Sequence, residues 1–132
     1  MSVLLSIKPK YVKEIEQGSK QYEFRKTIFK KETKEILVYA TAPIKKIVGK
    51  ILIDKIIEDS PKNLWANFKQ QAGINEIDFF KYFNGKDKGY AIKIKEYENF
   101  KNPINPYNKK ADFTAPQSYA YINNILPELM SN

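Results

Sequence analysis

Hydrophobic and polar residues alternate along this chain in short stretches, some with the two-residue period of a strand and some with the period of a helix. The pattern therefore predicts short strands and short helices. Residues 3–7 are a short apolar run, typical of a buried strand. Residues 9–17 have a helical period, in which Pro9 suits the first turn and Gly18 is a typical helix end. The apolar face of this helix consists of Tyr11, Val12 and Ile15.

A two-residue alternation follows this helix, over residues 20–25. Tyr22 and Phe24 alternate there with Glu23 and Arg25, and successive side chains of an extended segment point to opposite faces. We therefore expect the two aromatic side chains on one face and the two charged side chains together on the other.

Two more strands and two helices are predicted in the middle of the chain. β-Branched and aromatic residues predict strands over residues 35–41 and 47–57, with Gly49 as a bulge or bend in the second. Ser60 is the expected cap of a helix that Gly73 ends. The expected buried side chains of the two helices are Leu64, Trp65 and Phe68, then Ile77, Phe79, Phe80 and Phe83.

The last part of the chain predicts a strand, a long loop and a short closing strand. Residues 90–97 alternate as a strand, and residues 99–116 contain three prolines and predict a long loop. Residues 118–122 predict a final strand, and the last ten residues a short amphipathic tail. The whole order predicts an α+β fold: a small, strongly bent sheet or barrel flanked by short helices, in one domain over residues 1–132.

Composition adds a basic surface to this fold. The chain has 132 residues with 42% hydrophobic content, enough for the core of one domain. A formal charge of +8 favours nucleic acid or a nucleotide as partner, although lysines that serve only solubility are the alternative. No apolar run approaches the roughly 20 residues that a bilayer span needs, so we expect no membrane partner and a cytoplasmic location. The sequence carries no signal for the oligomeric state.

The absence of two residue types limits the chemistry. The chain contains no cysteine and no histidine, which excludes thiolate nucleophiles, imidazole bases and the usual zinc sites. No tight acidic cluster suggests a magnesium site, so we expect no metal and no cofactor. Any catalysis would have to use Lys, Glu, Asp, Ser, Thr or Tyr side chains.

The strongest candidate site is the charged part of residues 20–25. Arg25 is the only arginine among 23 basic residues, and its guanidinium can hold a phosphate with two parallel hydrogen bonds. We expect a cleft in which Lys20 and Arg25 hold a phosphate or base edge while Glu23 orients them. If the protein is an enzyme, Lys20 and Glu23 are the candidate catalytic acid and base. The alternative is an ion-pair strip on an exposed strand, which stabilises a protein little.

Three further residues are candidate ligand contacts at this cleft. Tyr39 could stack on a base, Thr41 could donate a hydrogen bond, and Ser118 follows the proline-containing loop. A tyrosine in the core and a threonine facing solvent are the alternatives for the first two.

Several segments together resemble the ASCH domain of the PUA-like superfamily. The resemblance rests on Gly18-Ser19-Lys20-Gln21-Tyr22-Glu23-Phe24-Arg25, Tyr39-Ala40-Thr41-Ala42-Pro43, Val48-Gly49, Gly89-Tyr90-Ala91-Ile92 and Pro116-Gln117-Ser118. It implies a PUA-like β-barrel with a cleft and a role in binding RNA or modified nucleotides. Some family members are ribonucleases, and one branch consists of amidohydrolases that act on acetylated cytidine.

The resemblance to the amidohydrolase branch is partial. Lys20 corresponds to the catalytic lysine of that branch, whereas Glu23 stands where the branch has a threonine nucleophile. A carboxylate does not replace a hydroxyl nucleophile like for like.

Three functions are therefore open. The leading hypothesis is an RNA- or nucleotide-binding module whose cleft contains Lys20, Glu23 and Arg25. The second is a hydrolase that acts on modified nucleosides, or on RNA phosphodiesters as a ribonuclease. The third is a protein-interaction module whose basic face meets an acidic partner.

Overall fold

The fold is built on six strands. A computed structural model of the protein describes residues 2–127. Its strands are β1 (Ser2–Ile7), β2 (Tyr22–Arg25), β3 (Glu35–Ala40), β4 (Lys46–Asp59), β5 (Gly89–Ile104) and β6 (Ala120–Tyr121). Its helices are α1 (Pro9–Gln17), α2 (Pro61–Phe68), α3 (Glu76–Tyr82), α4 (Pro106–Lys109) and α5 (Ile122–Ile125), with a 3₁₀ turn, η1 (Lys69–Gln71), after α2.

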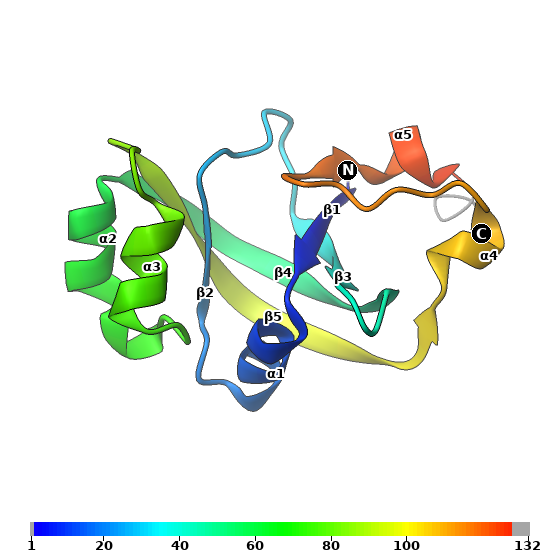
Figure 1. The fold of residues 1–132 in the computed structure, drawn as a ribbon, viewed down its shortest axis with the longest axis horizontal. Helices are drawn as coiled ribbons and strands as arrows, with labels where there is room; N and C mark the ends of the chain where they lie inside the picture. The colour runs from blue at the N-terminus through cyan, green and yellow to red at the C-terminus, as the bar shows by residue number, and fades with distance from the viewer. Residues whose placement is uncertain (1, 128–132) are drawn as a thin grey trace.

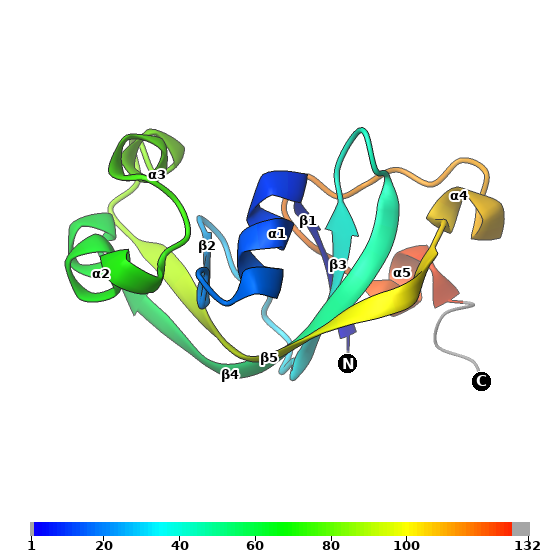
Figure 2. The same ribbon diagram turned by 90° about the horizontal axis from the view of Figure 1, so that it is seen from below.

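The strands form one mixed, curled sheet in the order β2-β5-β4-β3-β1-β6. β1 and β3 are parallel, and the other neighbouring strands are antiparallel. Figure 1 shows α2 and α3 at one end of the molecule, beyond β2, and α4 and α5 at the other. Figure 2 shows α1 inside the curl, between β2 and the β1–β3 pair. The predicted α+β fold, a small bent sheet flanked by short helices, is confirmed.

Local signals explain where the helices begin and end. Helix α1 starts at Pro9 and ends at Gly18, which has the left-handed φ of 88°. The Ser60 hydroxyl accepts a hydrogen bond from the backbone N–H of Asn63 and caps α2. Asn75 caps α3 in the same way, through the N–H of Asp78. These caps satisfy N–H groups that have no partner within the helices.

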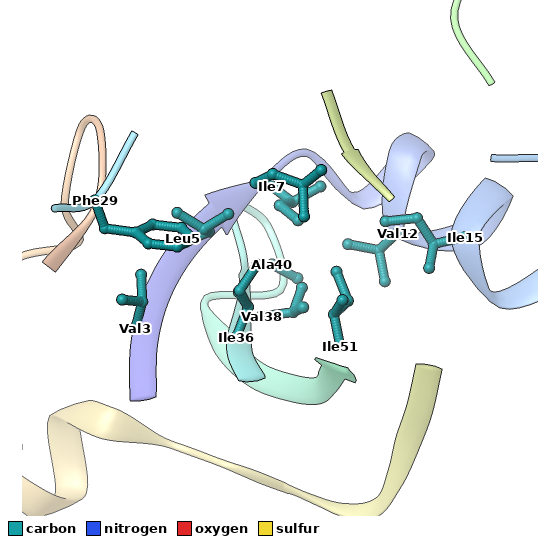
Figure 3. Close-up of a cluster of buried hydrophobic side chains, with 11 residues drawn as sticks. Val3, Leu5, Ile7, Val12, Ile15, Phe29, Ile36, Val38, Ala40 and Ile51 are labelled. Carbon is teal, nitrogen blue, oxygen red and sulfur yellow. The ribbon is translucent and has the colours of Figure 1, made fainter. Parts of the chain in front are cut away.

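The core consists of three clusters on the two faces of the sheet. The first lies inside the curl, where Val12 and Ile15 of α1 face Ile51 of β4 (Figure 3). The second fills the space between the α2–α3 pair and the strands β2 and β5, around Phe79. The third lies under α4 and α5 and includes Tyr39. Strands β1 and β3 are thus buried on both faces.

Gly49 marks an irregularity of β4, as predicted. The pairing register of β4 with β5 shifts between Ile47 and Gly49. The Glu98 carbonyl and the Tyr97 ring lie so close to Gly49 that a Cβ at this position would overlap them. A glycine is therefore required where the Glu98 carbonyl and the Tyr97 ring of the neighbouring strand β5 lie against β4.

The predicted loop over residues 99–116 is wrong in part. Strand β5 continues to Ile104 because its second half pairs with β4, and α4 follows at Pro106. Pro103 and the neighbouring polar residues hid this extension, because it depends on pairing with β4 and not on strand propensity. The final strand is shorter than predicted and gives way to α5 at Ile122; the end of the predicted tail, residues 128–132, lies outside the described residues.

Two predictions about the helical pair are also wrong. Ile77 was expected to be buried, but 79% of its surface is exposed. In a helix, Phe79 and Phe83 lie one turn apart on the buried face, and Ile77 lies about 200° around the axis from Phe79. Helix α2 ends at Phe68 and not at Gly73, because η1 continues the chain with a tighter turn.

Candidate functional site

The end of α1 leads directly into the candidate site. After the left-handed turn at Gly18, the backbone N–H of Lys20 donates to the Glu14 carbonyl, which fixes the chain as it leaves the helix. In β2, Tyr22 and Phe24 point into the second core cluster, and Glu23 and Arg25 contact each other on the opposite face. The predicted alternation is confirmed.

Lys20, Glu23 and Arg25 form a continuous chain of buried charges. Lys20 Nζ lies 3.8 Å from Glu23 Oε1, and Glu23 Oε2 accepts a hydrogen bond from Arg25 Nη1 at 3.1 Å. Only 3% of the Lys20 side chain and 8% of the Glu23 side chain are exposed, against 12% for Arg25. The exposed ion-pair strip considered from the sequence is therefore wrong: the three charges lie below the surface, with Arg25 as their outer end.

Lys20 is buried between the Phe24 ring and the backbone of Ala72 and Gly73. Its ammonium donates to the Ala72 carbonyl at 2.8 Å and lies 5.0 Å from the centre of the Phe24 ring. Burial lowers the pKa of Lys20, and the Glu23 carboxylate opposes that shift. Gly73, with a φ of 62°, packs its Cα against the Lys20 stem so closely that a Cβ would overlap it.

Arg25 joins the two edges of the sheet. Nη1 donates to the Ser6 carbonyl of β1 at 3.4 Å, and Nη2 to the Ser118 carbonyl, just before β6, at 2.7 Å. The Thr27 and Ser118 hydroxyls share a hydrogen bond at 2.6 Å. Because β2 and β6 are the two edge strands, these contacts connect one edge of the curled sheet to the other through side chains.

Tyr121 extends this connection. Its hydroxyl accepts hydrogen bonds from the backbone N–H groups of Lys30 at 3.0 Å and Lys31 at 2.9 Å. The Lys31 N–H is the main reason that the pKa of Tyr121 is lowered. We call this set of contacts, between residues 25–31 and residues 118–121, the seam.

The Arg25 guanidinium keeps part of its hydrogen-bonding capacity. Its known partners, Ser6, Glu23 and Ser118, use Nη1 and one hydrogen of Nη2. Within residues 2–127, Nε has no hydrogen-bond partner, and no side-chain nitrogen or oxygen without a partner is buried. Nε therefore reaches solvent, where it can donate to an oxygen of an anion.

Tyr39 and Thr41 do not bond to this chain of charges. The Tyr39 hydroxyl pairs with that of Tyr107 at 2.9 Å in the third core cluster. Burial, with this hydrogen bond, raises the pKa of Tyr39. Thr41 is half-buried in the turn after β3, where its N–H donates to the Ile7 carbonyl at 3.1 Å. Ser118, by contrast, lies at the seam beside Arg25.

Sequence reasoning missed several parts of the site. The Ala72 and Ser6 carbonyls are backbone atoms, which no residue type marks. Thr27 lies two residues after Arg25 and could have been considered from the alternation alone. Gly73 carried a signal, but as a helix end and not as the surface against which Lys20 packs.

The described residues contain neither a cluster of metal ligands nor a membrane-crossing helix. Within residues 2–127, no three Asp or Glu side chains gather closely enough to hold a metal ion. No helix in the same part of the chain has the length and apolar character needed to cross a bilayer.

A family model, a curated relative and a solved structure all identify the ASCH domain. The family model of the ASCH domain matches residues 5–116. An ASCH domain-containing ribonuclease of Zymomonas mobilis is 29% identical over 126 residues, which cover 90% of this chain and 82% of that protein. The crystal structure of ASCH from Zymomonas mobilis is 27% identical, covers 91% of this chain and 86% of that one, and has a TM-score of 0.83.

A second relative is a longer protein. Large ribosomal subunit protein uL22 of Ureaplasma parvum is 26% identical over 124 residues, which cover 92% of this chain. The match spans only 39% of that protein.

Proposed function

This chain belongs to the ASCH domain family, and from that premise we propose that it binds RNA, or a nucleotide from RNA, at the seam. The observation that carries the proposal is the position of Arg25, whose Nε reaches solvent while Nη1 and Nη2 are hydrogen-bonded within the protein. A guanidinium fixed in this way recognises a phosphate or base edge without losing rotamer entropy. The net charge of +8 supplies attraction to the RNA backbone.

The three charged residues have different roles in this proposal. Arg25 contacts the ligand, because its side chain is the most exposed of the three charged side chains. Glu23 orients the guanidinium through its 3.1 Å hydrogen bond, and Lys20 balances the Glu23 charge from inside the protein. The exposed hydroxyls of Thr27 and Ser118 lie beside Arg25 and can contact a ribose or phosphate oxygen.

Titration of RNA at several salt concentrations tests this proposal. We expect the affinity of the wild type to fall as salt rises, because bound phosphates release counterions. Arg25→Lys keeps the charge but loses the planar fork, and should weaken binding by about tenfold or more. Lys62→Ala, which removes an exposed charge on α2, is the matched control and should change affinity little.

Two results would contradict the proposal. One is a wild-type protein with no affinity for RNA, or with an affinity that does not depend on salt. The other is an Arg25→Lys variant that folds normally, by circular dichroism, and binds RNA as tightly as the Lys62→Ala control.

A second candidate function is RNA cleavage, which the name of the Zymomonas mobilis relative favours. Cleavage without a metal forms a bond from the ribose 2′ oxygen to phosphorus and breaks the bond to the 5′ oxygen. A base takes the 2′ proton, and an acid protonates the leaving oxygen. The Glu23 carboxylate is the candidate base and the Lys20 ammonium the candidate acid, and burial, which lowers the pKa of Lys20, makes this ammonium a better proton donor.

The burial of Lys20 and Glu23 sets a condition for this second function. Because both side chains lie beneath the surface, RNA would reach them only after the residues that cover them move. Lys20→Ala and Glu23→Ala should then abolish turnover of an RNA substrate in variants that remain folded. Unchanged cleavage rates in both variants would exclude the two residues as acid and base.

A further inference from the structure

The segment between β2 and β3 carries a row of exposed lysines away from the seam. Figure 1 shows residues 26–34, here called the strap, looping out from the end of β2 before the chain returns to β3. Its lysines are Lys26, Lys30, Lys31 and Lys34, and all four are exposed. The buried ring of Phe29 fastens the strap to the first core cluster. The lysines are therefore displayed from a backbone that is held at both ends and in its middle.

Two tyrosines hold the lysines at the seam end of the strap. The Lys26 ammonium lies 4.8 Å from the centre of the Tyr82 ring, and Lys31 lies 4.8 Å from that of Tyr121. The same tyrosine hydroxyls accept the backbone N–H groups of Lys26 and Lys31. These contacts fix both the backbone and the charges.

The far end of the strap lines a groove of about 560 Å³. Strand β4 contributes its irregular stretch, where the register with β5 shifts on both sides of Ile53 and the Ile53 N–H donates to the Lys34 carbonyl instead. The groove is lined by residues 32–34 of the strap, residues 52–56 of β4 and Lys95 of β5. Its position follows from the break in the β4–β5 ladder.

The groove combines positive charge with an apolar surface. Lys34, Lys55 and Lys95 are exposed, and none of them forms an ion pair with another residue in 2–127. Of the two acidic residues in the lining, Asp54 is paired with Lys93 outside it, at 3.5 Å. Three lysines thus face one unpaired carboxylate, that of Glu32.

The apolar part of the lining comes from Leu52, Ile53 and Ile56. Ile56 is one of the few large apolar residues with a markedly exposed side chain, 38% of its surface. An anion with an apolar face is the ligand that suits such a groove. A single RNA strand has both parts, since its bases are unpaired and can lie on apolar side chains while its phosphates meet lysines.

We propose that this groove is a second RNA subsite, which binds phosphates of the same single strand whose other part lies at Arg25. The proposal rests on RNA binding at the seam. The strap connects the two subsites, and its nine residues span at most about 30 Å when extended. The strap lysines would contact the intervening phosphates, so a long strand binds at both subsites and a mononucleotide at the seam alone.

The test compares two triple variants with two probes. Lys34, Lys55 and Lys95 are replaced by alanine in the groove variant, and Lys62, Lys69 and Lys86, which are exposed near α2 and α3, in the control. The probes are a ribonucleoside monophosphate and a single-stranded RNA long enough to span both subsites. For the long strand, the logarithm of the association constant falls linearly with the logarithm of the salt concentration. Loss of three phosphate contacts should make this slope less steep by about 2 in the groove variant. That change makes binding about 100-fold weaker at about 0.1 M salt.

The outcomes separate this inference from RNA binding at the seam. It is supported if the groove variant loses affinity for the long strand, keeps its affinity for the monophosphate, and the control binds both like the wild type. It is overturned if groove and control variants bind the long strand equally, even when Arg25→Lys shows that the seam binds RNA. It is also overturned if an RNA duplex competes with the long strand as well as an unlabelled single strand does.

Discussion

Removing the charge of Glu23 should destabilise the protein more than removal of any exposed carboxylate. In the Glu23→Gln variant, the ammonium of Lys20 stays inside the protein, with only 3% of its side chain exposed, and loses the carboxylate 3.8 Å away. The Ala72 carbonyl remains as its hydrogen-bond acceptor, at 2.8 Å. The variant therefore contains a buried positive charge without a counter-charge.

The size of the effect has two bounds. Removal of one partner from a buried ion pair costs about 3–5 kcal/mol. Alternatively, Lys20 can lose its proton. Deprotonating a lysine of ordinary pKa at neutral pH costs about 5 kcal/mol, and the cost is smaller here because burial already lowers the pKa of Lys20. We expect Glu23→Gln to lower the free energy of unfolding by about 3 kcal/mol, a large part of the about 5–15 kcal/mol of a typical domain.

The chain offers a control pair at the same distance. Lys50 Nζ and Glu35 Oε2 also lie 3.8 Å apart, but 35% of each side chain is exposed. Glu35→Gln should cost less than about 1 kcal/mol, because solvent screens the pair. Burial, and not the distance between the charges, accounts for the expected difference.

Urea denaturation of four proteins measures these effects: wild type, Glu23→Gln, Glu35→Gln and the double variant Lys20→Met/Glu23→Gln. The double variant no longer contains the unpaired ammonium and should recover about 2 kcal/mol relative to Glu23→Gln. Equal losses in Glu23→Gln and Glu35→Gln, or no recovery in the double variant, would refute the reasoning.

Three further predictions concern stability. Because burial lowers the pKa of Lys20, the unfolded chain binds this proton more tightly than the folded protein does. In urea titrations, the wild type should therefore gain stability relative to Lys20→Met as the pH rises towards 10.5. A stability difference that does not change with pH would contradict this. Gly73→Ala should lower the free energy of unfolding more than Gly85→Ala, because both have a positive φ but only Gly73 lacks room for a Cβ; equal losses would show that Lys20 does not fill that space. In thermal unfolding, Phe79→Ala should lower the free energy of unfolding by about 3–5 kcal/mol. Ile77→Gln should change it by less than about 0.5 kcal/mol, and a large loss at Ile77 would place this residue in the core.

Local chemistry was sufficient to predict the elements around the candidate site. Pro9 and Gly18 mark the two ends of α1, and the alternation after it places Glu23 beside Arg25 in β2. These features depend on residues close together in the sequence. For the same reason, the α+β fold and the helices α1, α2 and α3 could be predicted from caps and periods, whereas α4 and α5 were not predicted.

Contacts between distant residues could not be predicted in this way. The buried state of Lys20 depends on the Ala72 carbonyl, 52 residues away, and the seam depends on the Ser118 carbonyl, 93 residues from Arg25. Backbone acceptors leave no trace in the order of side chains. The second half of β5 is likewise a strand because β4 lies next to it, although its own residues favour a loop.

The position of a bound nucleotide relative to Arg25 tests the central claim most directly. A crystal structure of the protein with a ribonucleoside monophosphate should show a phosphate or base oxygen about 2.7–2.9 Å from Arg25 Nε, with the Glu23 and Ser118 contacts of the guanidinium intact. A nucleotide that is ordered elsewhere on the surface, with no contact to Arg25, would contradict RNA recognition at the seam.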